Sequence, residues 1–151
     1  MIDFTIETRI GRPPEEIFDH VSDPGKLHTW QTNTVSAIQE GDGPMGVGTR
    51  LREVHRMPGG KKAESVVEIA EFEPNRILAL RVIEGTPIHG RITLEPDGGG
   101  TLLRFRVYGQ LTGLMRAVQP LLGLGLRRQF AGYCATLKLE LENELPARGR
   151  R

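Results

Sequence analysis

Hydrophobic and polar residues alternate in short runs over the first two thirds of the chain, and Gly and Pro separate these runs. An apolar residue at every second position is typical of a β-strand with one buried face. In the first run, Phe4 and Ile6 lie on one side of the strand, whereas Glu7 lies on the other. The same alternation predicts further strands at residues 35–38, 48–57, 64–72, 77–84, 88–94 and 101–108.

Two short helices are predicted between the first and second strands. Pro13 and Pro14 begin the first of them, because a helix leaves the N–H groups of its first turn unbonded and proline has none. Glu15 and Glu16 follow, where the positive end of the helix dipole favours acidic side chains. Residues 24–30 are predicted to form the second short helix.

At the C-terminal end the apolar spacing changes to three and four residues, which indicates a long helix over residues 112–144. Its first half is apolar almost all round, whereas its second half has a charged outer face. Pro120 predicts a kink or a restart of the helix, because proline lacks the N–H and clashes with the preceding turn. The apolar face of the second half comprises Leu126, Phe130, Tyr133, Leu137 and Leu141.

This order of elements predicts an α+β fold of the helix-grip type. A curved antiparallel sheet of about seven strands would be covered on its concave side by the long C-terminal helix. If the first half of that helix packs loosely, an apolar cavity remains between helix and sheet. Residues 1–145 are predicted to form one domain, and residues 146–151 a basic, disordered tail.

Composition narrows the classes of function. The chain of 151 residues has 20 basic and 19 acidic side chains, so no nucleic-acid partner is predicted. A single cysteine, Cys134, excludes a disulfide within the chain and favours the cytoplasm. The N-terminal residues do not resemble a signal peptide, and no apolar run reaches the roughly 18 residues of a membrane-spanning helix. The histidines lack the spacing of zinc motifs, so neither a metal nor a cofactor is predicted, and His20, His28 and His89 are expected at the rim or surface.

Five short sequences, together with the order of elements, resemble the SRPBCC superfamily, which includes START-like lipid-transfer domains and the polyketide cyclase/dehydrase group. The resemblance covers nearly the whole chain and implies a helix-grip fold with a deep apolar pocket. Members of the superfamily range from carriers to enzymes, so the fold alone does not decide the activity. The matching sequences are RPPEEIF at residues 12–18, PGKLHTW at 24–30, GVGTR at 46–50, EFEPNR at 71–76 and GGTLLRF at 99–105.

Three polar residues are candidates for catalysis. Arginine is costly to bury, so the strand that contains Arg52 is predicted to turn Glu53 and His55 toward the cavity. Glu84 is predicted on the inner face of a later strand. A histidine tuned by carboxylates in an apolar site can move protons during an aldol-type cyclisation or a dehydration. The alternative is that these side chains form a satisfied polar pair or lie at the solvated mouth of the cavity.

The other inward-facing side chains predict a mostly apolar site for a small molecule. The predicted ligand-binding residues come from the second short helix, five strands and the first half of the long helix. They are Trp30, Leu51, Val67, Ile69, Leu80, Val82, Ile92, Phe105, Met115, Val118, Gln119 and Leu122.

Three functions remain open from the sequence. The favoured one is intracellular binding of a hydrophobic small molecule, lipid-like or polyketide-like. The second is a polyketide cyclase or dehydratase that uses His55 with Glu53 or Glu84. The third is a protein-interaction module that docks through the apolar first half of the last helix. The protein is predicted to be a monomer or a homodimer.

Overall fold

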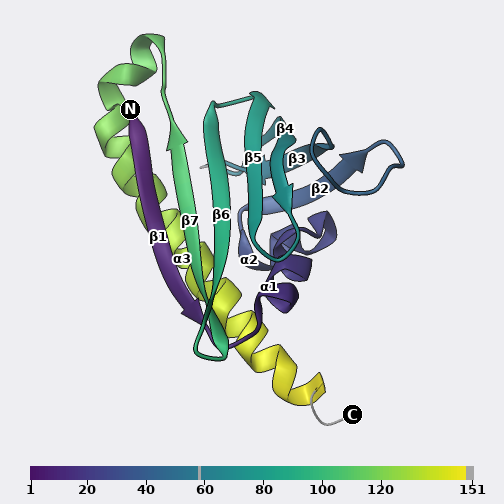
Figure 1. Ribbon diagram of the computed structural model, residues 1–151. Coiled ribbons are helices and arrows are strands. Elements are labelled where there is room, and N and C mark those ends of the chain that lie inside the picture. The colour runs from purple at the N-terminus through teal and green to yellow at the C-terminus, as the bar shows by residue number, and fades with distance from the viewer. Residues whose placement is uncertain (58, 149–151) are drawn as a thin grey trace.

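The computed structural model describes residues 1–57 and 59–148, with side chains as far as residue 143 (Figure 1). In this part of the chain, seven antiparallel strands form one sheet in the order β1-β7-β6-β5-β4-β3-β2. The order leaves β1 and β2 as the two edges. The strands are β1 (Ile2–Ile10), β2 (Thr34–Glu40), β3 (Arg50–Arg56), β4 (Lys62–Glu73), β5 (Ile77–Glu84), β6 (Ile88–Asp97) and β7 (Gly100–Gly109).

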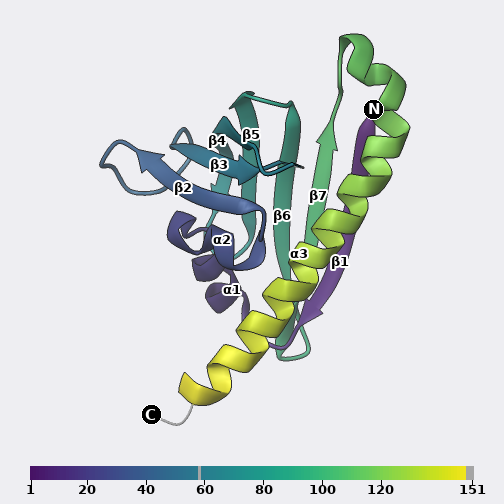
Figure 2. The same ribbon diagram turned by 180° about the vertical axis from the view of Figure 1, so that it is seen from behind.

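The helices lie on one side of the sheet. The short helices α1 (Pro14–Val21), η1 (Pro24–Lys26) and α2 (Leu27–Trp30) follow β1, and η2 (Gly113–Val118) leads into the long helix α3 (Gln119–Arg148). Figure 2 shows α3 crossing the sheet beside β1, with α1 and α2 in front of the other half. The predicted α+β class and helix-grip arrangement are confirmed. Of the predicted tail, residues 149–151 lie outside the described residues.

Local sequence explains where the helices begin. Pro14 occupies the first turn of α1, with Glu15 and Glu16 beside it, as predicted. The carboxylate of Asp23 accepts a hydrogen bond from the Gly25 N–H at 2.9 Å and caps the start of η1. The restart expected at Pro120 is confirmed, because η2 ends at Val118 and α3 begins one residue before the proline.

Two irregularities between β4 and β5 change which residues face inward. The pairing skips Ala70 in β4 and Ile83 in β5. A skipped residue reverses the alternation beyond it, because side chains alternate between the two faces at every position. Phe72 therefore faces inward, where its ring meets Phe18 of α1 at a centroid distance of 5.2 Å.

Aromatic side chains fill the space between the sheet and the second half of α3. Phe105 of β7 lies between Trp30 of α2, at 6.1 Å between ring centroids, and Phe130 of α3, at 5.2 Å. Phe130 also meets Phe4 and Tyr133 in edge-to-face contacts. This aromatic cluster joins α2, α3, β1 and β7 into one core.

The two parts of the C-terminal helical region are held differently. We call residues 113–126 the front segment and residues 127–143 the rear segment. In the rear segment, Glu140 accepts from Thr29 at 2.9 Å and lies 2.6 Å from the buried His20. The Tyr133 hydroxyl donates to Asn33 Oδ1 at 2.5 Å. The rear segment is therefore tied to the short helices and to the loop before β2 by specific polar contacts.

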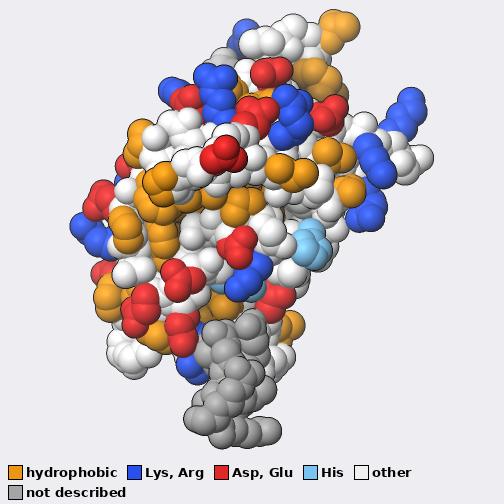
Figure 3. Space-filling view, turned by 90° about the vertical axis from the view of Figure 1, so that its right-hand side faces the viewer, with side chains coloured by type: hydrophobic (Ala, Val, Ile, Leu, Met, Phe, Trp, Pro, Cys, Tyr) orange, Lys and Arg blue, Asp and Glu red, His pale blue; other side chains and the backbone are white. Residues whose placement is uncertain are grey.

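Ion pairs cover the outer face of the sheet. Arg106 binds both carboxylate oxygens of Asp3, at 2.9 and 2.8 Å, and this contact holds the pKa of Asp3 below its usual value. Arg104 bridges two carboxylates, with one contact to Glu7 and one to Glu95. On the side of the molecule shown in Figure 3, hydrophobic side chains lie among charged side chains of both signs.

Candidate ligand-binding site

Strand β3 turns one acidic side chain into the interior. Leu51 and Glu53 are buried, whereas the arginines of the same strand are exposed, as the sequence predicts. Glu53 is 7% exposed and is the one buried carboxylate among the side chains that the structure describes. A carboxylate removed from water raises the free energy of the fold unless a partner compensates it. That partner is His55, two residues along the same face.

His55 is engaged at both ring nitrogens. Its Nε2 lies 3.1 Å from Glu53 Oε1, and Ser65 Oγ is 3.4 Å from the same nitrogen. Its Nδ1 lies 3.4 Å from Thr34 Oγ1. A carboxylate only accepts hydrogen bonds, so the neutral ring carries its proton on Nε2 and accepts from the Thr34 hydroxyl at Nδ1. The Glu53–His55 pair is thus a satisfied polar unit on the inner face, with 22% of the His55 side chain exposed.

A small hollow lies against Glu53, between the sheet and the short helices. Its volume is about 20 Å³, which is room for one water molecule. Ser22 and Asp23 contribute to its rim, and Met45 reaches it from the loop between β2 and β3. The apolar side chains that line it are Val21, Pro24, Leu27, Met45, Leu51, Ile69, Leu78 and Leu80.

The structure divides the predicted ligand-binding residues among separate places. Three of them, Leu51, Ile69 and Leu80, line the hollow beside Glu53. Four others are buried in the packed interior rather than around open space. These four are Trp30, Val67, Ile92 and Phe105.

Four of the remaining predicted residues lie in the front segment, and the fifth, Val82, lies on β5. Met115 and Val118 are about half exposed. Leu122 packs against the core, and Val82 is half-buried on β5. The side chain of Gln119 accepts a hydrogen bond from the Leu111 N–H at 2.8 Å. A single large cavity that joins all these residues is therefore not present in the described structure.

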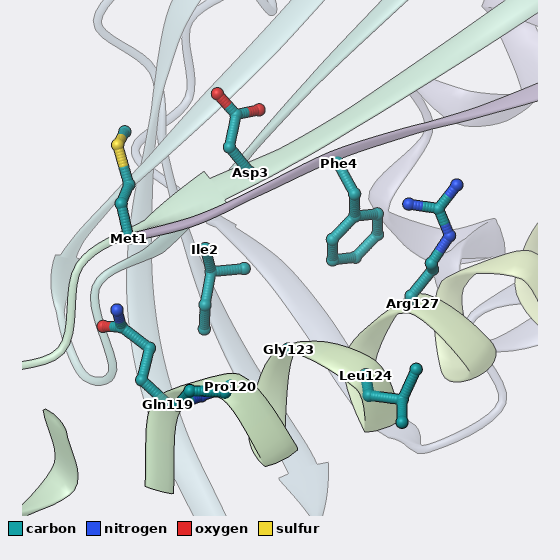
Figure 4. Close-up of a pocket in the computed structure, with 9 residues that line it drawn as sticks. All are labelled: Met1, Ile2, Asp3, Phe4, Gln119, Pro120, Gly123, Leu124 and Arg127. Atoms are coloured by element: carbon teal, nitrogen blue, oxygen red, sulfur yellow. The ribbon is translucent and has the colours of Figure 1, made fainter. Parts of the chain in front are cut away.

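A second hollow lies between β1 and the front segment (Figure 4). This β1–α3 groove is open to solvent and has a volume of about 400 Å³, within the size range of small-molecule sites. Ile2 and Phe4 face the helix across it, and Leu124 lines the helix side. The Arg127 guanidinium lies 5.8 Å from the centroid of the Phe4 ring. Of the residues that line this groove, only Gln119 was predicted from the sequence to bind a ligand.

Residues 1–142 match a protein family described as polyketide cyclase/dehydrase and lipid transport. The chain belongs to this family. The match covers nearly the full sequence and confirms the resemblance to the SRPBCC superfamily. The family description joins enzymes with carriers, and it does not say which of the two this member is. Among curated proteins, no sequence matches the chain.

Solved structures show the same fold at low sequence identity. The protein TTHA0849 from Thermus thermophilus has a TM-score of 0.78 and 20% identity, over 94% of this chain and 98% of that one. The di-domain ARO/CYC protein StfQ from the steffimycin biosynthetic pathway has a TM-score of 0.78 and 13% identity, over 96% of this chain and 52% of its own. The Aha1 dimer from Colwellia psychrerythraea has a TM-score of 0.66 and 19% identity, with 94% and 97% covered.

For this family member, Glu84 does not join the Glu53–His55 pair. Glu84 stands opposite Val66, which in turn pairs with the outward-facing Arg52. Directly paired residues of antiparallel strands share a face, so Glu84 lies on the outer side and is exposed. The prediction that it shares a face with Val82 is wrong, because the pairing skips Ile83.

The other histidines take structural positions. His20 is 5% exposed, so the prediction of a rim or surface position is wrong for it. His28 is exposed. His89 lies on the outer face beside Tyr108, and its Nδ1 accepts a hydrogen bond from the Val82 N–H at 3.0 Å. Burial and the nearby charge of Arg81 lower the pKa of His89, which keeps this acceptor unprotonated.

Sequence reasoning missed two residues that matter at the site. Met45 follows a glycine-rich turn, and nothing in its local pattern indicates that it reaches the interior. Asn33 lies between α2 and β2, where it binds Tyr133. Burial raises the pKa of Tyr133 to about 12. A polar residue directly before an alternating run was the one available signal for Asn33, and it is a weak one.

Among the side chains that the structure describes, in residues 1–57 and 59–143, no three from His, Cys, Asp or Glu come together in a group able to hold a metal ion. In the same residues, no helix is long and apolar enough to cross a membrane.

Proposed function

We propose that this protein binds a hydrophobic small molecule, lipid-like or polyketide-like, between the sheet and its short helices. The observation that carries the proposal is Glu53, a buried carboxylate that borders an apolar hollow. Stability does not call for an acid there, because an apolar side chain of similar size serves a core equally well or better. A few polar groups in an apolar site are instead what fixes the orientation of a bound molecule.

Trp30 supports this proposal. Its indole N–H is buried and has no hydrogen-bond partner among the described residues. A buried donor without an acceptor costs about 1–3 kcal/mol. An oxygen atom on a bound molecule would remove that cost. Trp30 does not line the hollow beside Glu53, so this donor becomes available to a bound molecule only if the hollow extends toward the aromatic cluster.

The hollow must widen to accept anything larger than water. Met45 is the side chain best placed to move, because it extends from a loop and methionine is flexible and unbranched. The loop is rich in glycine, and Gly41 and Gly48 both have positive φ. In this proposal Met45 fills the site when it is empty and swings aside when a molecule binds. The competing explanation is a hollow that holds one structural water.

Binding of N-phenyl-1-naphthylamine, a neutral apolar dye that fluoresces when shielded from water, tests the proposal. Met45→Trp would fill the hollow from the loop, and Val47→Trp places the same bulk on an exposed residue of that loop. We expect dye binding to the native protein, at least roughly tenfold weaker binding to Met45→Trp, and no change in Val47→Trp. Absence of dye binding, or equal binding by all three proteins, would overturn the proposal.

A cyclase or dehydratase activity is the second candidate, and the Glu53–His55 pair favours it. The pair provides a carboxylate and an imidazole 3.1 Å apart at an apolar site. Both ring nitrogens of His55 are engaged by protein groups, however, so the imidazole must first release Thr34 to accept a substrate proton. His55→Gln separates the two functions. An enzyme would lose turnover of a poly-β-ketone substrate while it retained the dye, whereas a carrier would change only in affinity.

A further inference from the structure

The front segment exposes a set of large apolar side chains. Leu114 is 95% exposed, Leu121 is 74% exposed and Leu124 is 56% exposed. Met115 and Val118 lie between them in sequence and are about half exposed. We call these five side chains the η2–α3 patch. Single exposed apolar residues are common, but several on one short helical segment indicate an interaction surface.

The η2–α3 patch lies at a corner of the molecule. In Figures 1 and 2, η2 and the start of α3 extend past the N-terminal end of β1, on the side of the sheet that α3 covers. No residue of η2 is buried. The segment is therefore a projection with apolar side chains at its tip, rather than a flat face.

The charged residues of the patch segment itself are all basic. Between Asp97 and Glu140 the sequence has no acidic residue. Arg116 lies within the patch segment, and Arg127 and Arg128 follow it on α3. In the described part of the chain, none of these three arginines forms an ion pair with a carboxylate. The patch thus combines exposed leucines with uncompensated positive charge.

Exposed leucines together with positive charge favour one kind of partner for the η2–α3 patch over others. A second copy that meets the same patch would bring the arginines of both copies together, with no acid in the segment to pair them. Nucleic acid offers phosphates but no apolar surface for the leucines. A lipid bilayer with anionic headgroups offers both, because apolar side chains insert at its interface while arginines bind the phosphates.

We propose that the η2–α3 patch docks the protein onto an anionic lipid bilayer. Leu114 and Leu121 insert among the headgroups, and Arg116 and Arg127 lie at the level of the phosphates. The β1–α3 groove shares Leu124 and Arg127 with this surface and opens beside it. The inference rests on exposure and charge, and it stands whether or not the interior binds a hydrophobic molecule.

Flotation with phosphatidylcholine vesicles, made with and without phosphatidylglycerol, tests the proposal on the full chain. We expect binding to the anionic vesicles, little binding to the neutral ones, and weaker binding at high salt. Leu121→Asp should weaken binding by roughly tenfold or more, because an inserted leucine is lost. Arg127→Gln should weaken it by roughly fivefold. Leu139→Asp is the matched control, since Leu139 is 62% exposed on the same helix but outside the patch.

Two results would overturn the lipid proposal. One is the absence of binding to anionic vesicles at low salt. The other is binding that Leu121→Asp leaves at the level of the Leu139→Asp control. Sedimentation velocity runs in parallel. If the native chain is a dimer that Leu121→Asp separates, and it binds no vesicle, a second copy occupies the patch instead. Dye binding in the Met45 experiment is unaffected by any of these outcomes, so the two proposals fail separately.

Discussion

The front and rear segments of the C-terminal helical region are both rich in apolar residues, yet they have opposite surroundings. In the rear segment Leu137 and Leu141 are fully buried over the aromatic cluster. In the front segment Leu114 and Leu121 are largely exposed. The rear segment has a sheet, two short helices and several polar partners beneath it. The front segment packs through only part of its surface, where Leu122 and Leu126 meet the core and Gly123 approaches Ile2.

The difference shows that an apolar sequence can serve two purposes in one element. Where a helix has a core beneath it, leucine contributes stability by leaving water. Where it has none, leucine adds nothing to the stability of the isolated chain. Its presence then points to a partner outside the chain. We therefore expect substitutions in the rear segment to affect stability, and those in the front segment to affect binding.

The largest effect should come from emptying the core beneath the rear segment. Leu137→Ala removes a side chain with no exposed surface, and we expect it to lower the free energy of unfolding by about 2–5 kcal/mol. Leu121→Ala makes the same change at an exposed site and should cost less than about 0.5 kcal/mol. Urea denaturation of both variants measures the contrast. Equal losses would mean that Leu121 also packs against the core.

A smaller loss of stability should follow when one hydrogen bond of the rear segment is removed. Tyr133→Phe leaves the half-buried Asn33 side chain without this donor, and about 0.5–1.5 kcal/mol of stability should be lost. Tyr108→Phe is the matched control on the outer face, where its ring contacts Arg106. Urea midpoints of the two variants provide the measurement. A control that loses as much as Tyr133→Phe would show that the loss is common to removal of any tyrosine hydroxyl and does not report the hydrogen bond to Asn33.

The smallest effect concerns alkaline pH. Burial raises the pKa of Cys134 to about 11 from a usual value of 9.0. The folded chain therefore keeps the thiol protonated, while the unfolded chain releases the proton, so stability falls as pH rises from about 9 to about 11. Cys134→Ala should flatten this part of the pH dependence of the urea midpoint. If the urea midpoint of the variant changes with pH as steeply as that of the native chain, the native thiol must be in contact with water.

The sequence predicts much of this fold because the fold depends on patterns that are local. Period-two runs place the strands, and Pro120 marks where α3 begins. The arginines of β3 correctly predict that Glu53 faces inward, since the energetic cost of burying arginine is large. Each of these inferences needs only neighbouring residues.

The site is less predictable because it depends on contacts between distant elements. One skipped residue, Ile83, places Glu84 on the opposite face, and strand alternation gives no sign of it. His20 is buried because Glu140 approaches it from a helix 120 residues away in sequence. Trp30 and Phe105, both predicted to line a cavity, pack against each other in the aromatic cluster. Side-chain packing of this kind is set by the whole core.

Binding of a hydrophobic molecule in the interior of this protein can be measured without knowing the ligand in advance. Native mass spectrometry of the freshly purified chain, followed by denaturing extraction, detects and identifies anything that the protein retains. We expect a bound apolar molecule on the native protein and on Val47→Trp, and its loss from Met45→Trp. Interior binding would be contradicted if the native protein carried no such molecule and also did not bind the apolar dye.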